Sequence, residues 1–226
     1  MSVAPAEVAI RAASIFEPIP PDPMPDDVPL PANALHLAFG LSTCAHGTIT
    51  AIDLSAVRAA PGVTAVYSAE DWPDMPDCSP SVHDEPLLAV GRVHYVGQPV
   101  FLVAADSHLN ARKAVRLAKI TYDDLPALLT VDDALAANSR LEQGPVVWTK
   151  GDAVSALSRA PHIVEGSFDV GGQEHFYLEG QIAFALPGDD GGVSITSSTQ
   201  HPTEIQHKVA HALHLPMSAV RVETRR

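Results

Sequence analysis

The sequence is poor in cysteine, in aromatic residues and in long apolar runs. Cys44 and Cys78 are its two cysteines, and they lack the paired spacing of a zinc or iron–sulphur site, so we expect free thiols and no bound cluster. The longest apolar run, Val100–Ala105, is far shorter than the roughly 20 residues that cross a membrane. The N-terminus has no basic start followed by an apolar core, so a cytoplasmic location is expected.

Basic residues are scarce as well. Fourteen Lys and Arg stand against twenty-seven Asp and Glu, which gives a formal net charge of −13 at pH 7. This excess of negative charge repels nucleic acid and anionic membrane surfaces, so neither is an expected partner. The 226 residues, 46% of them hydrophobic, suffice for one large or two small globular domains with a sizeable core.

Several catalytic and metal-binding signatures are missing. The sequence contains no GxGxxG, GxxxxGK or GxSxG motif, so nucleotide binding and serine hydrolysis have no direct support. His207, His211 and His214 share one stripe of the last predicted helix, but no HExxH motif or acidic ligand at helical spacing accompanies them. An exposed polar helix face explains these histidines more simply than zinc does, so no metal ligand is predicted.

Proline is concentrated at the N-terminus. Eight of the twenty prolines precede residue 32. Because proline fixes φ and removes a backbone donor, we expect residues 1–25 to form a mobile arm without ladder pairing. A strand is predicted from Ala34 to Leu41, with a hairpin partner around Ile49–Leu54, and residues 71–86 are predicted to form a loop.

The rest of the chain alternates strands with short helices. Val93–Ala105 predicts a strand interrupted at Gly97, followed by a helix capped by Asp106 or Ser107 and by the strand Lys119–Asp124, an order that indicates an α/β unit. Further elements are expected as short helices at 131–137 and 153–159, an antiparallel pair at 180–186 and 193–198, and a last helix from Pro202 to just before Pro216. The change in pattern predicts a domain boundary near residue 160.

Two segments concentrate polar chemistry. One is GGQEHFYLEG, Gly171–Gly180; the other is SSTQHPTEIQHKVAHAL, which places Gln200 between a strand end and a helix start. Such a junction can aim a side chain at a ligand. A carboxamide donates and accepts without carrying charge, so Gln200 can hydrogen-bond a metal-oxo group without displacing the metal's ligands. Taken alone, a glutamine at such a junction is more often solvated or capping.

These two segments and VGQPVFLVAADSHLNARKAVRLAKITYDD together resemble the molybdenum-binding subunit of bacterial xanthine dehydrogenase, in the molybdenum hydroxylase family that includes aldehyde oxidase. The three motifs occur in the family's order, and the likeness runs from about Asp26 to Arg226. The resemblance implies an α+β fold. It divides the chain into a hammerhead-type α/β domain over 26–140, a linker and short helix over 141–160, and the truncated beginning of a molybdenum-cofactor-binding domain over 161–226.

The resemblance also implies a reaction and a set of site residues. The reaction is hydroxylation of a purine, hypoxanthine or xanthine to urate, with oxygen from water and with electrons leaving through iron–sulphur clusters and FAD on a partner subunit. Gln200 matches the glutamine that hydrogen-bonds an oxygen ligand of molybdenum held by molybdopterin. Gln173, Glu174 and His175 are expected to support the cofactor indirectly, with Phe176–Leu178 packed beneath it. For any one of these residues, structural packing is an equally good explanation.

The chain departs from the family pattern at both ends. The proline-rich arm replaces the family's usual opening segment, and the glycine-rich GGGFGGKE segment, whose glutamate is the general base, has no counterpart before Arg226. We therefore predict no catalytic residue in this chain and no activity without the remainder of the molybdenum-binding subunit. Two other hypotheses stay open: a non-catalytic hammerhead module for assembly or binding, and a small zinc protein, which the helical-face argument disfavours.

Overall fold

The computed structural model describes residues 8–10, 29–72, 74–80, 82–140, 144, 146–176 and 180–224. Contacts divide the chain into two units, one formed by residues 128–177 and a larger one formed by residues 1–127 with 178–226. This division differs from the boundary predicted near residue 160, because strands beyond residue 178 join the same sheet as strands of the first 127 residues.

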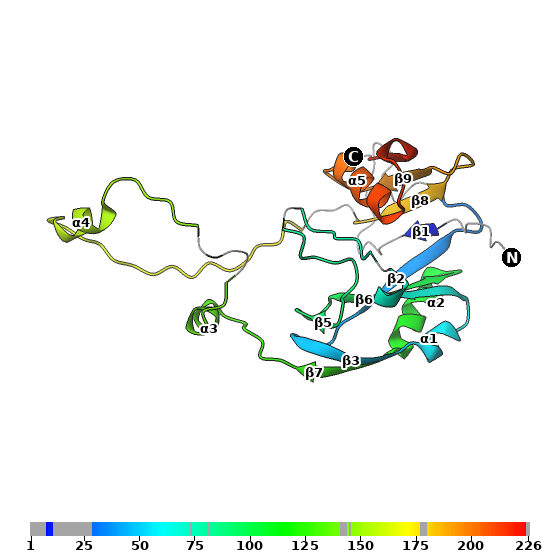
Figure 1. The fold of residues 1–226 in the computed structure, drawn as a ribbon, viewed down its shortest axis with the longest axis horizontal. Helices are drawn as coiled ribbons and strands as arrows, with labels where there is room; N and C mark the ends of the chain where they lie inside the picture. The colour runs from blue at the N-terminus through cyan, green and yellow to red at the C-terminus, as the bar shows by residue number, and fades with distance from the viewer. Residues whose placement is uncertain are drawn as a thin grey trace. The chain divides into compact units, whose positions relative to one another are not determined.

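The larger unit contains a seven-stranded sheet with the order β10-β9-β8-β1-β2-β6-β4 (Figure 1). β2 pairs antiparallel with β6, and β6 pairs antiparallel with β4. The antiparallel pair β8–β9 is present as predicted. The strands are β1 Val8–Ile10, β2 Leu35–Leu41, β4 Val63–Ser68, β6 Pro99–Ala105, β8 Ala183–Pro187, β9 Val193–Ser197 and β10 Val220–Glu223.

β1 lies inside the predicted N-terminal arm. It pairs in parallel with β2 and antiparallel with β8. The expectation of an arm without ladder pairing is therefore wrong for Val8–Ile10, because these residues fall between Pro5 and Pro18 and each has a backbone N–H to donate. The other residues of the predicted arm, 1–7 and 11–25, lie outside the described residues.

A second sheet has three strands in the order β5-β3-β7, with β3 at Gly47–Asp53, β5 at Arg92–Val93 and β7 at Lys119–Asp124. The predicted hairpin between β2 and β3 is wrong, because the two strands belong to different sheets. The α/β unit predicted around residue 110 also extends over both sheets. Its first strand, β6, belongs to the seven-stranded sheet, and its second strand, β7, belongs to the three-stranded sheet. β3 instead pairs antiparallel with β7, where Ile49 lies opposite Tyr122 and Ile52 opposite Ile120. Such apolar cross-strand pairs stabilise a sheet.

Two short helices, α1 at Ser55–Arg58 and α2 at His108–Ala114, pack beside β4, β6 and β2. The 3-10 turn η2, Ala69–Asp71, follows β4, and the 3-10 turn η3, Val115–Leu117, continues α2. α2 begins as predicted, because the Ser107 hydroxyl accepts a hydrogen bond from the Asn110 N–H at 3.3 Å. Ala111 and Ala114 are fully buried, which lets the helix approach the sheet closely.

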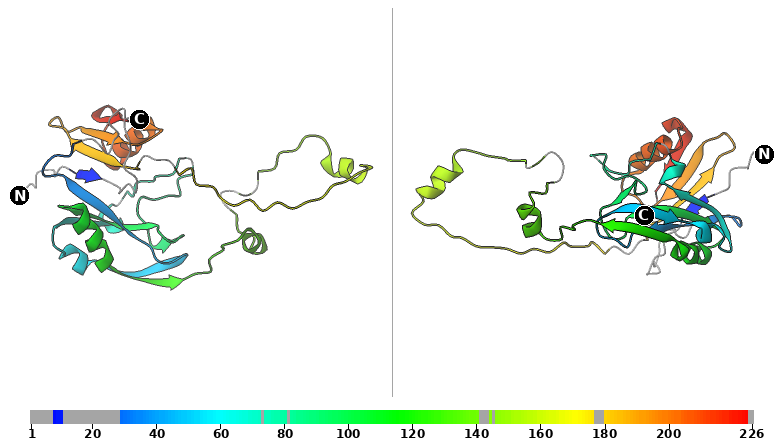
Figure 2. Two further views of the ribbon diagram at one scale, coloured as in Figure 1. Left: turned by 180° about the vertical axis from the view of Figure 1, so that it is seen from behind. Right: turned by 60° about the horizontal axis from the view of Figure 1, so that its bottom comes forward.

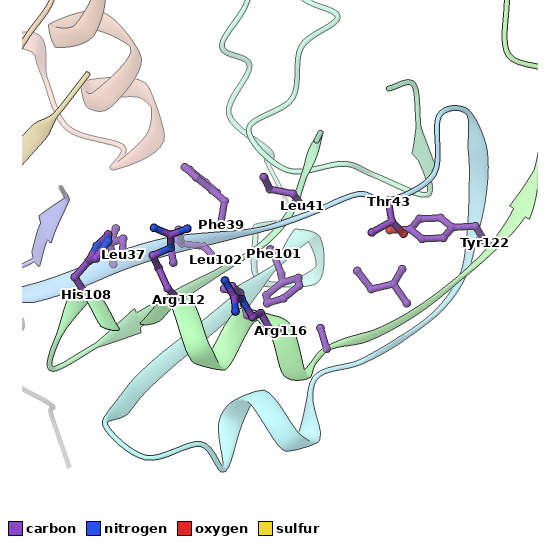
Figure 3. Close-up of a pocket in the computed structure, with 15 residues that line it drawn as sticks. Leu37, Phe39, Leu41, Thr43, Phe101, Leu102, His108, Arg112, Arg116 and Tyr122 are labelled. Atoms are coloured by element: carbon purple, nitrogen blue, oxygen red, sulfur yellow. The ribbon is translucent and has the colours of Figure 1, made fainter. Parts of the chain in front are cut away.

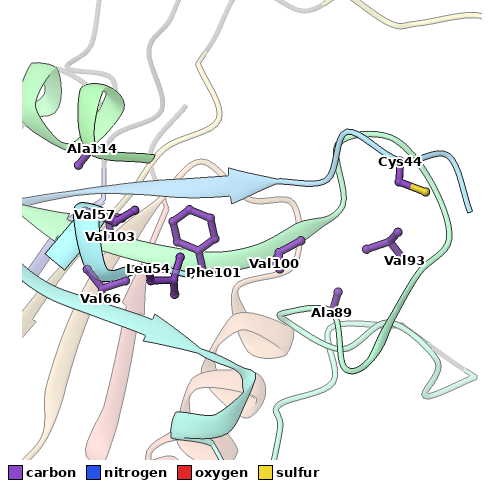
Figure 4. Packing of buried hydrophobic residues seen from close by; sticks show 10 residues of the cluster. All are labelled: Cys44, Leu54, Val57, Val66, Ala89, Val93, Val100, Phe101, Val103 and Ala114. Carbon is purple, nitrogen blue, oxygen red and sulfur yellow. The ribbon is translucent and has the colours of Figure 1, made fainter. Parts of the chain in front are cut away.

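The main core of the larger unit lies around α1, β4 and β6 (Figure 4). Phe101, which is 1% exposed, is the largest fully buried side chain of the described residues. It lies opposite Gly40 in the pairing of β2 with β6. The other buried members of this cluster are Cys44, Leu54, Val57, Val66, Ala89, Val93, Val100, Val103 and Ala114.

The C-terminal part of the larger unit is a strand–helix–strand crossover. The helix α5, Pro202–Ala212, and the 3-10 turn η4, Met217–Ala219, connect β9 to the parallel strand β10. Pro202 stands in the first turn of α5, as predicted. A separate cluster buries Ala210 from α5 against Ile195 and Val220, with Ile205 and Val209 packed at its margin.

The unit of residues 128–177 contains the two predicted short helices, α3 at Val131–Ala136 and α4 at Ala153–Ser158 (Figure 2). The Asp152 carboxylate caps α4 by accepting a hydrogen bond from the Ser155 N–H at 2.9 Å. Val164, Phe168 and Val170 alternate with polar residues, but the described residues 161–176 contain no strand, and Val164 is 97% exposed. Across the described part of the chain, no helix has the length and apolarity needed to cross a bilayer.

Candidate functional site

Gln200 lies just beyond the carboxyl end of β9, in the short connection that leads into α5. β9 and β10 are parallel, so their carboxyl ends meet at one edge of the sheet. In open sheets with parallel strands, ligands bind in the crevice outside this edge. The predicted position of Gln200 between a strand and a helix is therefore confirmed, and it is a position from which a side chain can meet a ligand.

Hydrogen bonds fix the backbone on both sides of Gln200. The Ser198 N–H donates to the Ile182 carbonyl at 3.0 Å, and the Ile182 N–H donates to Ser198 Oγ at 2.9 Å. The Thr224 hydroxyl, just after β10, donates to the Thr199 carbonyl at 3.1 Å. The connection is thus tied to β8 on one side and to the end of β10 on the other. A side chain presented from such a fixed backbone keeps its direction.

The carboxamide of Gln200 is exposed and has no hydrogen-bond partner among the described residues. It therefore has donors and an acceptor available for a ligand. The next residues open α5, where the His201 N–H donates to Thr199 Oγ1 at 3.0 Å and Pro202 occupies the first turn. The amino end of an 11-residue helix favours a negatively charged group beside it.

The GGQEHFYLEG segment belongs to the unit of residues 128–177 up to residue 177, whereas Gln200 belongs to the larger unit. Gln173, Glu174 and His175 are exposed, and no hydrogen bond joins them to other described residues. Phe176 is 72% exposed, and its expected place beneath the cofactor stays a prediction. Tyr177 and Leu178, for which the same packing was expected, lie outside the described residues.

The three C-terminal histidines are exposed: His207 and His211 on α5, and His214 just beyond it, as the helical-face argument predicts. Within the described ranges, no group of three or more His, Cys, Asp or Glu is arranged to hold a metal ion. Leu213, which follows the last residue of α5, is 51% exposed.

Sequence reasoning missed Gln206, which holds the crossover together. Its Nε2 donates to the carbonyls of Met217 at 3.0 Å and Val220 at 2.7 Å, so it fastens the start of β10 to α5. The one indication in the sequence is that Gln206 lies a single helical turn before Ala210, the residue that the structure shows to be buried. Lys208 was missed too, and its Nζ donates to the Ser79 carbonyl at 2.6 Å, which joins α5 to the loop after β4.

Both cysteines are free, as predicted. Burial raises the pKa of the Cys44 thiol, and a hydrogen bond from its Sγ to Asp124 Oδ1 at 3.2 Å raises the pKa further. The thiolate, and not the thiol, is the reactive form of cysteine. Cys44 is thus a structural thiol and not a candidate nucleophile.

Two protein families match this chain. The family described as "Aldehyde oxidase and xanthine dehydrogenase, a/b hammerhead domain" matches residues 25–126, and "Molybdopterin cofactor-binding domain" matches residues 136–226, which include Gln200. The chain belongs to the xanthine dehydrogenase and aldehyde oxidase family of molybdenum hydroxylases. It consists of a hammerhead domain followed by part of a molybdopterin-binding domain, which confirms the predicted α+β fold class.

Relatives within and around this molybdenum hydroxylase family carry different substrate names. Xanthine dehydrogenase of Drosophila subobscura is 42% identical over 197 residues, which cover 86% of this chain and 15% of that protein. Aldehyde oxidase 1 of Cavia porcellus is 40% identical over 203 residues, which cover 89% of this chain and 15% of that protein. The solved structure of quinoline 2-oxidoreductase from Pseudomonas putida 86 matches with a TM-score of 0.77 and 26% identity, over 89% of this chain and 28% of that chain. The chain thus spans about 15% of the length of these two curated relatives.

Proposed function

We propose that the chain is the N-terminal part of a xanthine dehydrogenase-like molybdenum hydroxylase subunit that converts hypoxanthine and xanthine to urate with oxygen from water. The observation that carries the proposal is Gln200, whose exposed carboxamide stands at a fixed strand–helix junction inside the stretch that matches the molybdopterin-binding family. Identity to xanthine dehydrogenase supports a purine substrate, and the similar identity to aldehyde oxidase 1 makes an aldehyde the alternative.

The residues of this chain fit a supporting role toward the cofactor. In the proposal, Gln200 donates a hydrogen bond to an oxygen ligand of molybdenum, while Gln173, Glu174 and His175 support the molybdopterin indirectly. The amino end of α5 favours the negative charge of such a cofactor. The cofactor supplies the hydroxylation chemistry when bound. The general base belongs to the remainder of the subunit, and the iron–sulphur clusters and FAD belong to a partner subunit.

The proposal is tested by Gln200→Ala in the completed enzyme, formed from this chain, the remainder of its subunit and the electron-transfer partner. A donor at Gln200 would stabilise the transition state more than the bound substrate, so its loss should lower turnover more than substrate affinity. Losing one such donor costs on the order of 3 kcal/mol, or about a hundredfold in kcat. Steady-state kinetics together with molybdenum content measure the effect.

The matched control is His211→Ala, because His211 is exposed on α5, the helix that follows Gln200. This variant should keep turnover within about twofold, as substitutions of exposed residues usually have small effects. Full turnover of Gln200→Ala at full molybdenum occupancy would show that Gln200 does not contact the reacting group.

A second candidate function is a non-catalytic module that assembles with related subunits. The exposed apolar side chains of residues 128–177 favour it, with Trp148 91% and Phe168 93% exposed. Metal analysis separates the two candidates. The chain alone should retain no stoichiometric molybdenum under either one. Joining it to the remainder of the subunit should give molybdenum, and adding the electron-transfer partner should give activity, only under the first. Stoichiometric molybdenum in the chain alone would contradict both.

A further inference from the structure

A groove of about 750 Å³ runs along β2 in the larger unit (Figure 3). Every residue from Leu37 to Leu41 lines this groove, together with Phe101 from β6 and Tyr122 from β7. Successive side chains of a strand point to opposite faces of the sheet. Because five successive residues of β2 contact the groove, it follows the length of this strand, with α2, η3 and β7 lining it as well.

Along this groove, no described strand covers one edge of β2. The pairing of β1 with β2 joins Val8 to Leu35 and Ala9 to His36 and extends no further among the described residues. From Leu37 to Leu41, β2 has β6 on one side and no described strand on the other. Such an edge presents backbone N–H and C=O groups that can pair with another extended chain.

The two sides of this edge differ in chemistry. Figure 3 shows Phe39 and Leu41 on one side of β2 and Phe101 and Arg116 on the other. Phe39 and Leu41 are 39% and 51% exposed, so the first side offers uncovered apolar surface.

The other side of the edge is basic. Arg112 of α2 and Arg116 of η3 line the groove, and both are exposed. Neither guanidinium has an ion pair or a hydrogen bond to another described residue. In a chain with a formal net charge of −13, two uncompensated guanidinium groups side by side form a local site for carboxylates.

We propose that this edge of β2 binds an extended segment of another polypeptide in which acidic and apolar side chains alternate. The segment adds a strand beside Leu37–Leu41 through backbone hydrogen bonds. Its carboxylates face Arg112 and Arg116, and its apolar side chains cover Phe39 and Leu41. The spacing of the two arginines matches that of successive carboxylates in such a segment. Four helical residues rise about 6 Å, and two strand residues rise about 7 Å. This protein-binding site goes beyond the proposed hydroxylase function and does not depend on the cofactor.

A labelled peptide tests the proposal directly. The probe is a fluorescein-tagged peptide of about eight residues, the length of an ordinary strand, in which Glu alternates with Val. Its fluorescence anisotropy is titrated with the purified full chain at low salt. We expect saturable binding that weakens about tenfold when Arg112→Glu and Arg116→Glu are combined, since like charges then face each other. N-methylation of alternate peptide amides should abolish binding, because it blocks strand pairing.

The control is Lys113→Glu, which makes the same charge change as Arg112→Glu alone, at an exposed residue of α2 that does not line the groove. It should change the dissociation constant by less than about twofold. Unchanged thermal melting of each variant shows that the fold is intact, and Arg112→Gln replaces any reversal that fails to fold. Four results would overturn the proposal: a dissociation constant above about 1 mM, equal binding of a Lys–Val peptide, an equal effect of Lys113→Glu, or dimerisation of the chain through this edge.

Discussion

Gly40 lies directly against the ring of Phe101 in the pairing of β2 with β6. A Cβ atom at position 40 would lie 1.9 Å from Cε1 of that ring, so Gly40→Ala must displace Phe101 from the core. Overpacking of this kind should lower the free energy of unfolding by about 1–3 kcal/mol. Urea denaturation measures this loss. Gly166→Ala is the control, because a Cβ there meets no atom within 4 Å, and it should stay within about 0.5 kcal/mol. Equal stability of both variants would show that the Phe101 ring has room to move.

Cys44 offers a second test at the scale of one residue. Burial raises the pKa of its thiol, and Asp124 raises it further through the Sγ–Oδ1 hydrogen bond and through its negative charge. Asp124→Ala removes both the hydrogen bond and the negative charge, so the pKa of the Cys44 thiol should fall and more thiolate should be present at a given pH. In a Cys78→Ser background, alkylation by iodoacetamide should therefore be faster near pH 8 and its pH profile should shift to lower pH. An unchanged profile would mean that burial alone sets the reactivity of Cys44.

Among the elements, the loop after β4 depends on Asp77. Its Oδ1 accepts hydrogen bonds from the Ser79 N–H at 3.0 Å and the Ser79 hydroxyl at 2.7 Å, and its Oδ2 accepts one from the Glu85 N–H at 3.1 Å. Desolvation raises the pKa of Asp77, but these hydrogen bonds outweigh it and hold the pKa below its usual value. The same loop meets α5 through Lys208 and the Ser79 carbonyl.

A lowered carboxyl pKa makes the contribution of this loop depend on pH. The folded pKa lies below the unfolded value of about 3.9, so the stabilisation is present above about pH 4 and is lost as the pH falls through the folded pKa. Asp77→Asn should lower the unfolding free energy by about 1 kcal/mol at pH 7, with a smaller loss near pH 3. Asp84→Asn, in the same loop but without a described hydrogen bond, should have little effect at either pH. Equal losses for Asp77→Asn at both values of pH would exclude the carboxylate as the cause.

For the whole molecule, the unit of residues 128–177 leaves most of its large apolar side chains exposed. Trp148, Val164 and Phe168 are all more than 90% exposed, and burying each would stabilise a complex by roughly 1.5–3 kcal/mol. Under the proposed function, we therefore expect this unit to be covered when the chain associates with the remainder of the subunit. In a Trp72→Phe background, Trp148 fluorescence should be readily quenched by acrylamide in the chain alone. After association, the Trp148 emission should shift to shorter wavelength, and acrylamide should quench it less.

A Trp148→Phe variant in the native Trp72 background shows how much signal arises from Trp72. Association demonstrated by gel filtration without any change in Trp148 emission would mean that residues 128–177 stay exposed in the complex. The partner surface would then lie elsewhere on the molecule.

The sequence by itself determined the local elements and the family. The cap of α2 at Ser107, the start of α5 at Pro202 and the strand β2 could be predicted, because each depends on residues within about four positions along the chain. Three motifs in order sufficed for the family, and the position of Gln200 at the end of β9 followed from the neighbouring pattern. The roles of Gln200 and of Gln173, Glu174 and His175 toward a cofactor stay predictions.

The tertiary structure alone decided which strands pair and which side chains meet. β3 leaves β2 to pair with β7, and Val8–Ile10 enter the sheet between β2 and β8. The contact of Gln206 with β10 arises in the same way, as does the edge of β2 beside Arg112 and Arg116 that no described strand covers. The physical reason is that strand pairing joins residues far apart in the chain, and it is chosen by the fit of whole side-chain sets that no local window of sequence contains.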